Sequence, residues 1–342
     1  MRKVYVGLEL ASRFCVVTAI DTKGRKLETR VLETSERSLI GFVKGLGAKV
    51  HVLMEEGEMA DWAWRTLLPH AFKVDVADPV RNAWIARDPG KNDRVDSEKL
   101  AELARTGNYR PVIHLESLQM VHFKMAVKQY EETTEDVARQ KTKIKALYRT
   151  QGIITTGNEP WGRRREDFLG SISCGLVPTM LLELEKLDWL MACKARMRRR
   201  LAELAKQFPI VARLQAMPGC GLISAVRLVA YIGDPHRFSS KRKLWRYARL
   251  GIVRPETGGK PIGRERLDKR GCGSLKDASR TIFNRACATR RDNLIKRSYR
   301  RCLANTGNDV HARLTCQRKI LAIAWAMWRD DTAYDDNLDI RA

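Results

Sequence analysis

The stretch KVYVGLEL, residues 3–10, decides the fold of the N-terminal part of the chain. Its even-numbered residues are all apolar and point to one side, whereas Tyr5, Gly7 and Glu9 point to the other. A period of two residues predicts a β-strand with two different faces. This strand therefore begins the fold, and it carries one carboxylate, that of Glu9, close to its end.

The residues after this strand predict an ordered series of further elements. Two more strands are indicated at 14–21 and 27–33, and helical spacing that ends in glycine follows at 36–47. The remaining elements are a strand at 49–55, a helix at 60–70, a strand at 72–79 and a helix that begins near residue 93. Three strands followed by helix, strand, helix, strand and helix form the order of the ribonuclease H-like fold.

Two aspartates open the last of these helices, in the stretch GKNDRVDSEKLAELA, residues 90–104. One interpretation is structural: Asp93 and Asp96 cap the free N–H groups and suit the positive end of the helix. The other is chemical, because residues three apart share a helix face and both carboxylates can then point at one metal ion. In the ribonuclease H-like fold, acids of the first strand, the fourth strand and the last helix meet at divalent metal.

Carboxylates stand at both matching strand positions. Glu9 lies in the first strand, and Glu55 ends the fourth with Glu56 beside it. Three elements thus supply acids where this fold holds its metal, which favours the metal interpretation over capping alone. The choice between Glu55 and Glu56 stays open.

The composition indicates a soluble protein with a polyanionic partner. The 342 residues carry a formal net charge of +24, and phosphate neutralisation rewards such an excess, so nucleic acid is the expected partner. A hydrophobic content of 44% is enough for packed cores. Eight separated cysteines without a CxxC pair, and only six histidines, argue against a zinc site. No apolar run reaches the ~20 residues of a membrane span, so we expect a cytoplasmic, nucleoid-associated protein.

The middle of the chain is expected to be helical. Apolar or aromatic residues recur every seven residues from Phe123 to Ile144, and at spacings of three and four from Leu187 to Phe208. These patterns predict coiled-coil helices. A hairpin inside one chain and an arm that dimerises both fit them. Between the two patterns, the polar, Gly- and Pro-containing segment 155–171 predicts a loop.

The last third carries two features typical of nucleic-acid binding. The motif PGCG, with Gly219 and Gly221, precedes an apolar helix, and such a helix-hairpin-helix-like turn lets backbone N–H groups approach a phosphate. Any tight turn between helices gives the same pattern. Basic residues then alternate with Trp245 and Tyr247, which suits a nucleic-acid face or a solvated basic helix. The basic residues expected to bind nucleic acid there are Lys241, Arg242, Lys243 and Arg246.

Together these features resemble the DEDD-type insertion-sequence transposases, the "one-ten" family related to the Piv invertases. The likeness covers roughly residues 3–325 and rests on ordered motifs: VYVGLEL, VLMEEG, DPVRNAWIARDPGKNDRVDSEKLAELAR, LQAMPGCGLISAVRLVAYIGDPHRFSSKRKLWRYARLGIV and RGCGSLKD. The family implies an α/β plus α architecture. Its parts would be a ribonuclease H-like (RuvC-like) DEDD domain at 1–115, a coiled-coil dimerisation region at 116–210, a mainly α-helical transposase domain at 211–330 and a frayed tail at 331–342.

The resemblance implies a DNA recombinase that cuts and rejoins strands through a covalent protein–DNA phosphoester. The family's four acids hold Mg²⁺ or Mn²⁺, and the matching residues here are Glu9, Glu55, Asp93 and Asp96. Its nucleophile is a serine of the C-terminal domain, matched here by Thr257 in PETGGK. The implied partners are donor and target DNA, a structured non-coding guide RNA (bridge RNA), and further copies of the chain in dimers that pair into tetramers.

Two catalytic positions depart from the family pattern. Glu9 replaces an aspartate but still offers oxygen ligands, and Thr257 replaces serine with another known type of nucleophile. We expect an active enzyme. The basic neighbours expected to neutralise charge at the reacting phosphate are Lys260, Arg264 and Arg266. Three serines are fallback nucleophiles for which ordinary loop or helix-cap roles are the simpler interpretation: Ser239, Ser240 and Ser274.

Two other functions stay open on the sequence alone. One is a RuvC-like junction nuclease that uses water as its nucleophile and forms no covalent intermediate. The other is a relative with an altered site that binds nucleic acid without catalysis. The target DNA and the guide RNA lie outside the chain, so its residues do not specify them.

Overall fold

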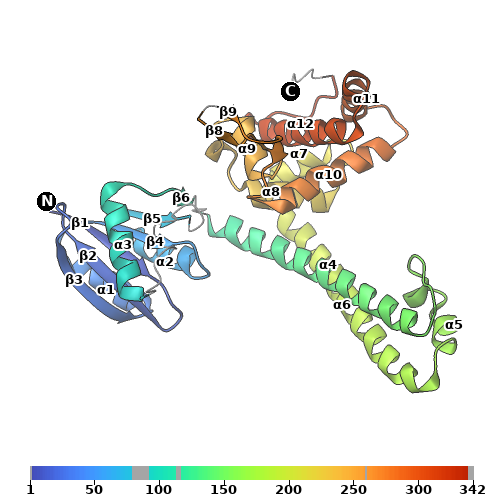
Figure 1. Cartoon of the computed structure of the whole chain (residues 1–342), viewed down its shortest axis with the longest axis horizontal. Coiled ribbons are helices and arrows are strands. Elements are labelled where there is room, and N and C mark those ends of the chain that lie inside the picture. Colours follow the sequence, from blue (N-terminus) through green and yellow to red (C-terminus); the bar gives the residue numbers. More distant parts are fainter. Residues whose placement is uncertain (1, 79–91, 113–116, 259, 338–342) are drawn as a thin grey trace. The chain divides into compact units, whose positions relative to one another are not determined.

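The computed structural model describes residues 2–78, 92–112, 117–258 and 260–337. The chain divides into two compact units, residues 1–116 and 117–342 (Figure 1). The predicted division into a catalytic domain, a helical region, a transposase domain and a tail stays a prediction. Several predicted features lie outside the described residues: most of the segment before Asn92, the first domain boundary near residue 115, Gly259 of the glycine-rich loop, and residues 338–342 of the tail.

The N-terminal unit is built on a six-stranded sheet with the order β3-β2-β1-β4-β5-β6. β1 is parallel to β4, and β4 to β5, whereas the pairs β1–β2, β2–β3 and β5–β6 are antiparallel. The strands are β1 (Lys3–Glu9), β2 (Phe14–Ile20), β3 (Lys26–Glu33), β4 (Lys49–Glu55), β5 (Lys73–Ala77) and β6 (Pro111–Val112). The helices of this unit, in the part of the chain that the structure describes, are α1 (Glu36–Gly45), α2 (Ala60–Leu67) and α3 (Asp93–Thr106).

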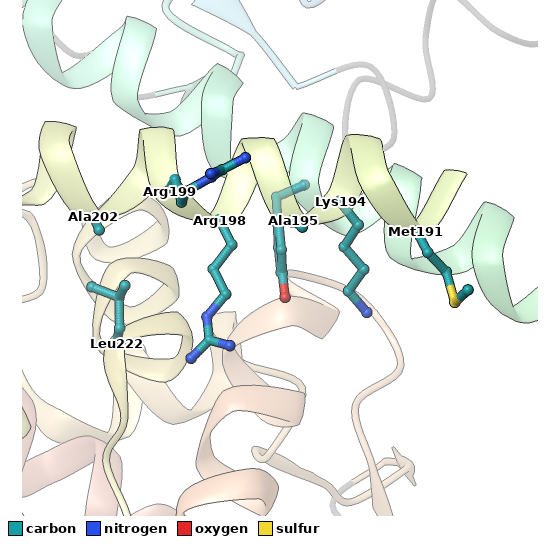
Figure 2. Close-up of a pocket in the computed structure, with 8 residues that line it drawn as sticks. Met191, Lys194, Ala195, Arg198, Arg199, Ala202 and Leu222 are labelled. Carbon is teal, nitrogen blue, oxygen red and sulfur yellow. The ribbon is translucent and has the colours of Figure 1, made fainter. Parts of the chain in front are cut away.

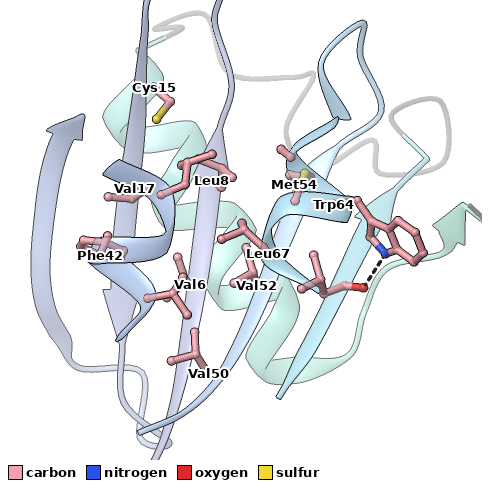
Figure 3. Close-up of a cluster of buried hydrophobic side chains, with 14 of the residues drawn as sticks. Val6, Leu8, Cys15, Val17, Phe42, Val50, Val52, Met54, Trp64 and Leu67 are labelled. Atoms are coloured by element: carbon pink, nitrogen blue, oxygen red, sulfur yellow. Dashed lines mark hydrogen bonds between the residues drawn. The ribbon is translucent and has the colours of Figure 1, made fainter. Parts of the chain in front are cut away.

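One face of the sheet packs against α1 and α2. The even-numbered residues of β1 and β4 point to this side and form an apolar cluster with Leu39, Phe42 and Leu67 (Figure 3). Trp64 closes the edge of the cluster, and its indole Nε1 donates to the Val74 carbonyl oxygen at 3.1 Å. The alternation read in residues 3–10 is therefore confirmed.

The opposite face of the sheet packs against α3. Tyr5 and Leu53 contribute to this cluster from the strands, and Leu100 and Ala104 from the helix. Gly7 marks the closest approach, because a Cβ on it would lie 1.9 Å from the carbonyl oxygen of Ser97. Only a residue without a side chain lets the helix backbone lie so near the strand. Among the described residues, the chain is a mixed α/β protein with twelve α-helices and a central sheet, consistent with a ribonuclease H-like DEDD domain.

Two long helices begin the second unit, α4 (Leu118–Thr150) and α6 (Val177–Ala205). They pack side by side (Figure 1). The Gln140 side chain donates a hydrogen bond to Glu183, and the Thr133 hydroxyl donates one to the sulfur of Met197. Residue numbers therefore rise along α4 in the direction in which they fall along α6. The pair is an antiparallel hairpin within one chain, and the heptad residues Phe123 to Ile144 are buried in it.

The segment 155–171, predicted to be a loop, is partly helical. It contains the 3₁₀ turn η1 (Glu159–Trp161) and the helix α5 (Arg165–Gly170). The prediction was wrong because a few apolar residues scattered among polar ones are enough to pack the segment on the hairpin: Leu169 is buried in the same cluster as Tyr148.

The apolar helix α8 (Leu222–Ile232) packs against α7, α10 and α4, and α12 packs against α9, α10 and α11. The other elements are η2 (Cys174–Leu176), α7 (Pro209–Gln215), η3 (Pro235–Arg237), α9 (Lys241–Tyr247), β7 (Ile252–Val253), β8 (Glu256–Thr257), β9 (Lys260–Pro261), β10 (Arg266–Leu267), α10 (Gly273–Ala288), α11 (Leu294–Thr306) and α12 (Asp309–Arg329). None of the helices in the described ranges has the length and apolar composition needed to cross a bilayer.

The first part of the predicted tail is fixed rather than frayed. The Asp336 carboxylate accepts a hydrogen bond from the backbone N–H of Leu294 at 2.9 Å and forms an ion pair with Arg297 at 3.1 Å. Tyr334 donates to the same carboxylate at 2.7 Å. An acid at the start of α11 satisfies a free N–H group of that helix, which gives the tail a specific anchor.

A polar cluster is enclosed between β4, β5 and the chain after α3. Asp75 accepts from His51 Nε2 at 2.8 Å and from the Tyr109 hydroxyl, and pairs with Lys73 at 2.6 Å. Burial alone would raise the pKa of Asp75, but the bonds from His51, Lys73 and Tyr109 outweigh it and hold that pKa below its usual range. Burial and the bond to Asp75 raise the pKa of Tyr109 to about 12.

We predict that Asp75→Asn destabilises the N-terminal unit in a pH-dependent way. At neutral pH the loss should be about 1–3 kcal/mol, because the buried His51 and the partly buried Tyr109 lose a charged acceptor. A depressed folded pKa contributes stability above the unfolded value of about 3.9, and this contribution is lost as pH falls toward the folded pKa. Urea unfolding at several pH values should therefore show the difference from wild type shrinking below about pH 4.

Asp61→Asn is the matched control, because Asp61 forms a more exposed pair with Arg65 at 2.9 Å on one helix. It should cost no more than a few tenths of a kcal/mol. Equal effects of the two substitutions at every pH would contradict the role given to Asp75.

Candidate active site

Glu9 and Glu55 lie at the ends of neighbouring parallel strands. Leu8 of β1 is in register with Met54 of β4, so the next residue of each strand is a glutamate. Both glutamates line a cavity of about 290 Å³ whose other walls are the loops 10–12 and 56–60. The sheet thus brings together two of the four predicted metal ligands.

The alternation of β4 favours Glu55 over Glu56 as the partner of Glu9. Leu53 lies on the α3 face of the sheet, and Glu55, two residues later, has the same orientation. Glu56 follows the end of the strand, and its backbone N–H donates to Ala77 at 3.0 Å. Both side chains reach the cavity, but Glu55 comes from the strand face that Glu9 shares.

The two aspartates occupy the first turn of α3. Asn92, not an aspartate, caps the helix, and its side chain accepts from the Arg94 backbone N–H at 3.1 Å. Asp93 is exposed, and Asp96 lies 3.7 Å from the ammonium group of Lys99. Because Asn92 fills the N-cap position, side-chain capping does not explain the aspartates.

Of the four predicted acids, the structure places two in one cavity, Glu9 and Glu55. Asp93 and Asp96 are not among the residues that line the cavity of Glu9 and Glu55. Within the described ranges, no group of three or more Asp, Glu, His or Cys side chains is placed to hold a metal ion. The four-acid site stays a prediction.

Glu9 and Glu55 nevertheless fit a divalent cation. Mg²⁺ is commonly held by one or two carboxylates, with water and substrate phosphates completing its coordination. Sequence reasoning missed two further lining residues with suitable oxygen atoms, Ser12 and Glu58. The signal for Glu58 was the run of acids EEGE at residues 55–58.

We predict that replacing Glu9 and Glu55 together by glutamine weakens Mn²⁺ binding by more than the ~10–100-fold typical of losing an outer-shell partner. The carboxylates would themselves be ligands, and the neutral amides bind hard cations poorly. Titration of the free protein with Mn²⁺, followed by electron paramagnetic resonance, measures this. Glu56→Gln is the control and should bind Mn²⁺ like wild type. A stronger effect of Glu56→Gln than of Glu55→Gln would reverse the assignment.

Thr257 lies on a small exposed hairpin of the second unit. β8 and β9 pair antiparallel, with Thr257 opposite Lys260 and Glu256 opposite Pro261. Gly258, at the turn, has a φ of +57°, which an L side chain rarely adopts. A hydroxyl and an ammonium group therefore come from adjacent strand positions at an exposed tip, an arrangement that can receive a phosphate. Arg264 and Arg266 are exposed on the same loop.

The predicted basic face of α9 is only partly available. Trp245 donates from Nε1 to the Arg318 carbonyl oxygen at 2.8 Å, so this ring is held within the protein. Arg246 pairs with the buried Asp268 at 3.3 Å. Arg242 and Lys243 are exposed. Lys241 lies over the Trp245 ring, with 5.6 Å between its Nζ and the ring centroid.

The glycines of the predicted helix-hairpin-helix-like turn face α10. Gly219 has a φ of +80°, and a Cβ on it would lie 2.4 Å from the carbonyl oxygen of Ile282. A Cβ on Gly221 would lie 2.8 Å from a guanidinium nitrogen of Arg285. Close packing against α10 is sufficient reason for Gly219, so phosphate binding by this turn stays a prediction.

The fallback serines have ordinary local roles where the structure defines them. Ser240 caps α9 and accepts from the Lys243 backbone N–H at 3.4 Å. Ser274 donates to Glu131 Oε2 at 3.0 Å. Ser239 is exposed. Among the candidate hydroxyls, that of Thr257 is the one presented by an exposed glycine-rich hairpin next to a cation.

Comparisons with known proteins find two transposase domain families along the chain. Residues 6–150 match a transposase domain of the DEDD type from IS110 elements, and residues 211–300 match the domain described as the transposase IS116/IS110/IS902 family. A transposase for insertion sequence element IS1111A from Coxiella burnetii is 21% identical over 262 residues, which cover 75% of this chain and 71% of that relative.

Proposed function

We propose that this chain cuts and rejoins DNA through a covalent bond to Thr257. The chain carries both domains of the IS110 transposase family and is a DNA transposase. The observation that carries the proposal is the position of Thr257, exposed on a hairpin and paired in register with Lys260. A nucleophile that attacks a polymer backbone has to be accessible, and its phosphate has to be held by positive charge.

The proposed exchange conserves phosphodiester bonds. Thr257 Oγ1 attacks a backbone phosphorus in line, an Oγ1–P bond forms, and the bond from phosphorus to the 3′ oxygen breaks. The 3′ oxygen leaves with a proton as a free hydroxyl, and the proton of the threonine hydroxyl passes to a base. The 3′ hydroxyl of the partner strand then attacks the same phosphorus and releases Thr257. No ATP is required, since each bond broken is replaced by an equivalent one.

Positive side chains would stabilise the reacting phosphate. Lys260 lies opposite Thr257, and Arg264 and Arg266 are exposed on the following turn and strand. Preorganised cations at the place where negative charge develops lower the barrier most.

DEDD transposases depend on a divalent metal ion in general. We propose Mg²⁺ or Mn²⁺, held by Glu9 and Glu55 with Asp93 and Asp96 as the remaining acids. When bound, such an ion supplies Lewis-acid stabilisation of charge on phosphoryl oxygens. The shared cavity of Glu9 and Glu55 supports this assignment. The position of α3 supports it too, because Ser97, the residue after Asp96, lies against Gly7 of β1.

A transposase binds DNA, and we further propose a structured guide RNA as a second polyanionic partner. The resemblance to the RNA-guided members of the family supports this. The net charge of +24 is compatible with a protein that neutralises two nucleic acids.

We predict that Thr257→Ala abolishes the covalent protein–DNA adduct, whereas Thr257→Ser retains it. Alanine lacks the hydroxyl, and serine restores it with less crowding. The adduct would be trapped on labelled donor DNA with Mg²⁺ and guide RNA and detected after SDS. Asp93→Ala should slow strand exchange by roughly a hundredfold or more, since metal-ion stabilisation is worth several kcal/mol.

Two results would favour the rival functions. Cleavage that persists in Thr257→Ala without any adduct would identify a nuclease that uses water. Salt-sensitive binding without Mg²⁺-dependent strand exchange, unchanged by Asp93→Ala, would identify a non-catalytic binding protein.

The helical hairpin also supports a proposed self-association. Leu182 and Trp189 of α6 are 66% and 63% exposed, and they lie seven residues apart, so they share one outer face. Large apolar side chains exposed in a row favour a second copy of the hairpin as the partner. The dimer and its pairing into a tetramer are proposals.

We predict that Leu182→Lys combined with Trp189→Lys shifts the protein toward monomer, because two charges would be buried in the proposed interface. Sedimentation velocity over a range of concentrations measures the shift. Met125→Lys is the matched control, since Met125 is 59% exposed on α4 but belongs to the other end of the hairpin. A double variant that associates as wild type does would remove Leu182 and Trp189 from the interface.

A further inference from the structure

A groove runs along α6 where this helix passes α4 and the beginning of α8 (Figure 2). It has a volume of about 930 Å³. Figure 2 shows Met191, Lys194 and Arg198 projecting from the same side of α6, as expected from their spacing of three and four residues. The lining residues are Tyr130, Met191, Lys194, Ala195, Arg198, Arg199, Ala202 and Leu222.

The groove concentrates positive charge. Among the described residues, no ion pair joins an acid to Lys194, Arg198 or Arg199. Burial lowers the pKa of Lys194, and the nearby charges of Lys141, Arg227 and Arg198 lower it further. Because Lys194, Arg198 and Arg199 have no ion-paired acid among the described residues, they favour an anionic occupant.

The beginning of α8 adds to this potential. Leu222, its first residue, lines the groove, and Gly221 at the N-cap position has no side chain to satisfy the first N–H groups. Leu222 therefore places the first turn of an eleven-residue helix, with its positive end, at the wall of the groove. Phosphate oxygens are well suited to such a place.

The floor of the groove is apolar. Met191, Ala195, Ala202 and Leu222 contribute carbon surface, and the Lys194 ammonium lies 5.7 Å from the centroid of the Tyr130 ring. A duplex presents phosphates and sugars on its outside, whereas a single strand also presents base faces, which gain from apolar and aromatic contacts. The combination of cationic edge and apolar floor therefore favours a single strand.

The groove is held in shape by a polar cluster. Glu131 of α4 accepts from the hydroxyls of Tyr231 at 2.5 Å and Ser274 at 3.0 Å, and its other oxygen lies 2.7 Å from Arg227 Nε. The carboxylate thus ties the hairpin to α8 and α10. A preformed groove binds a flexible strand at a lower entropic cost.

We infer that this groove binds a short single-stranded segment of DNA, with Lys194, Arg198 and Arg199 on its phosphates and the apolar floor against its bases. The inference rests on the proposed function only for the identity of the polymer. A strand freed by cutting would have to be held until it is rejoined, and this groove supplies such a holding surface.

The test is binding of a labelled oligodeoxythymidylate of about 16 nucleotides, within the usual site sizes for single strands. Lys194→Ala combined with Arg198→Ala should weaken binding roughly tenfold to a hundredfold at about 0.15 M salt, since charge-assisted bonds are lost. The slope of log K against log salt should fall by about 1.4, at ~0.7 for each phosphate contact. EDTA is present throughout, so the result does not depend on the acids or on Thr257.

Arg196→Ala combined with Arg200→Ala is the matched control, because it removes the same charge from exposed positions of the same helix outside the groove. This control variant should retain most of the affinity for the oligodeoxythymidylate and most of the slope of log K against log salt. Equal losses in the two double variants would overturn the inference, as would equal losses on duplex DNA. A loss seen with oligouridylate and not with oligodeoxythymidylate would replace DNA by RNA and overturn it too. If the groove variants bind as expected but the wild-type protein forms no covalent adduct with DNA, the proposed covalent chemistry is refuted and the inference about the groove stands.

Discussion

The close approach of Gly7 to α3 constrains the packing of the N-terminal unit. A Cβ at this position would overlap the carbonyl oxygen of Ser97 and lie 2.4 Å from the backbone nitrogen of Ala101. The helix therefore lies directly on β1, and its first turn is brought to the end of the strand where Glu9 stands. A larger residue would move α3 outward and take Asp93 and Asp96 with it, so a single absent side chain fixes how far these two aspartates lie from β1.

A second constraint acts on the loop that carries Thr257. Its tip is exposed, but its base is tied to α9 and to the residues just after it. Asp268 is buried, pairs with Arg246 and Arg270, and donates its backbone N–H to Gly251 at 2.9 Å. The backbone N–H of Arg270 contributes most to lowering the pKa of Asp268, so the carboxylate stays charged between the arginines. An accessible hydroxyl on a fixed base is the arrangement that a nucleophile for a large substrate requires.

Sequence reasoning succeeded where one residue period dominated. Alternation in β1 predicted the strand and the face that carries Glu9, because each face of the sheet is buried against different helices. The face of Glu55 was not predicted, and it follows from the burial of Leu53 against α3. Sequence reasoning failed where tertiary packing overrides composition: segment 155–171 is polar, yet Leu169 fixes it on the hairpin. The groove was missed for a related reason. Lys194 reads as one more position of a heptad pattern, and only the approach of α8 turns it into part of a binding surface.

The two departures from the family pattern suit their surroundings. Glu9 is the last residue of β1 and opens into a cavity that also receives Glu55 and Glu58, so its extra methylene has space at the end of a strand. Thr257 is exposed and lies in a strand pair, where β-branched residues are favoured. Its methyl group can point to solvent while the hydroxyl faces a phosphate. Glu9 keeps the carboxylate and moves it one methylene further from the backbone, whereas Thr257 keeps a hydroxyl on Cβ and adds a methyl group beside it. The local surroundings of Glu9 and Thr257 are therefore compatible with the roles proposed for them.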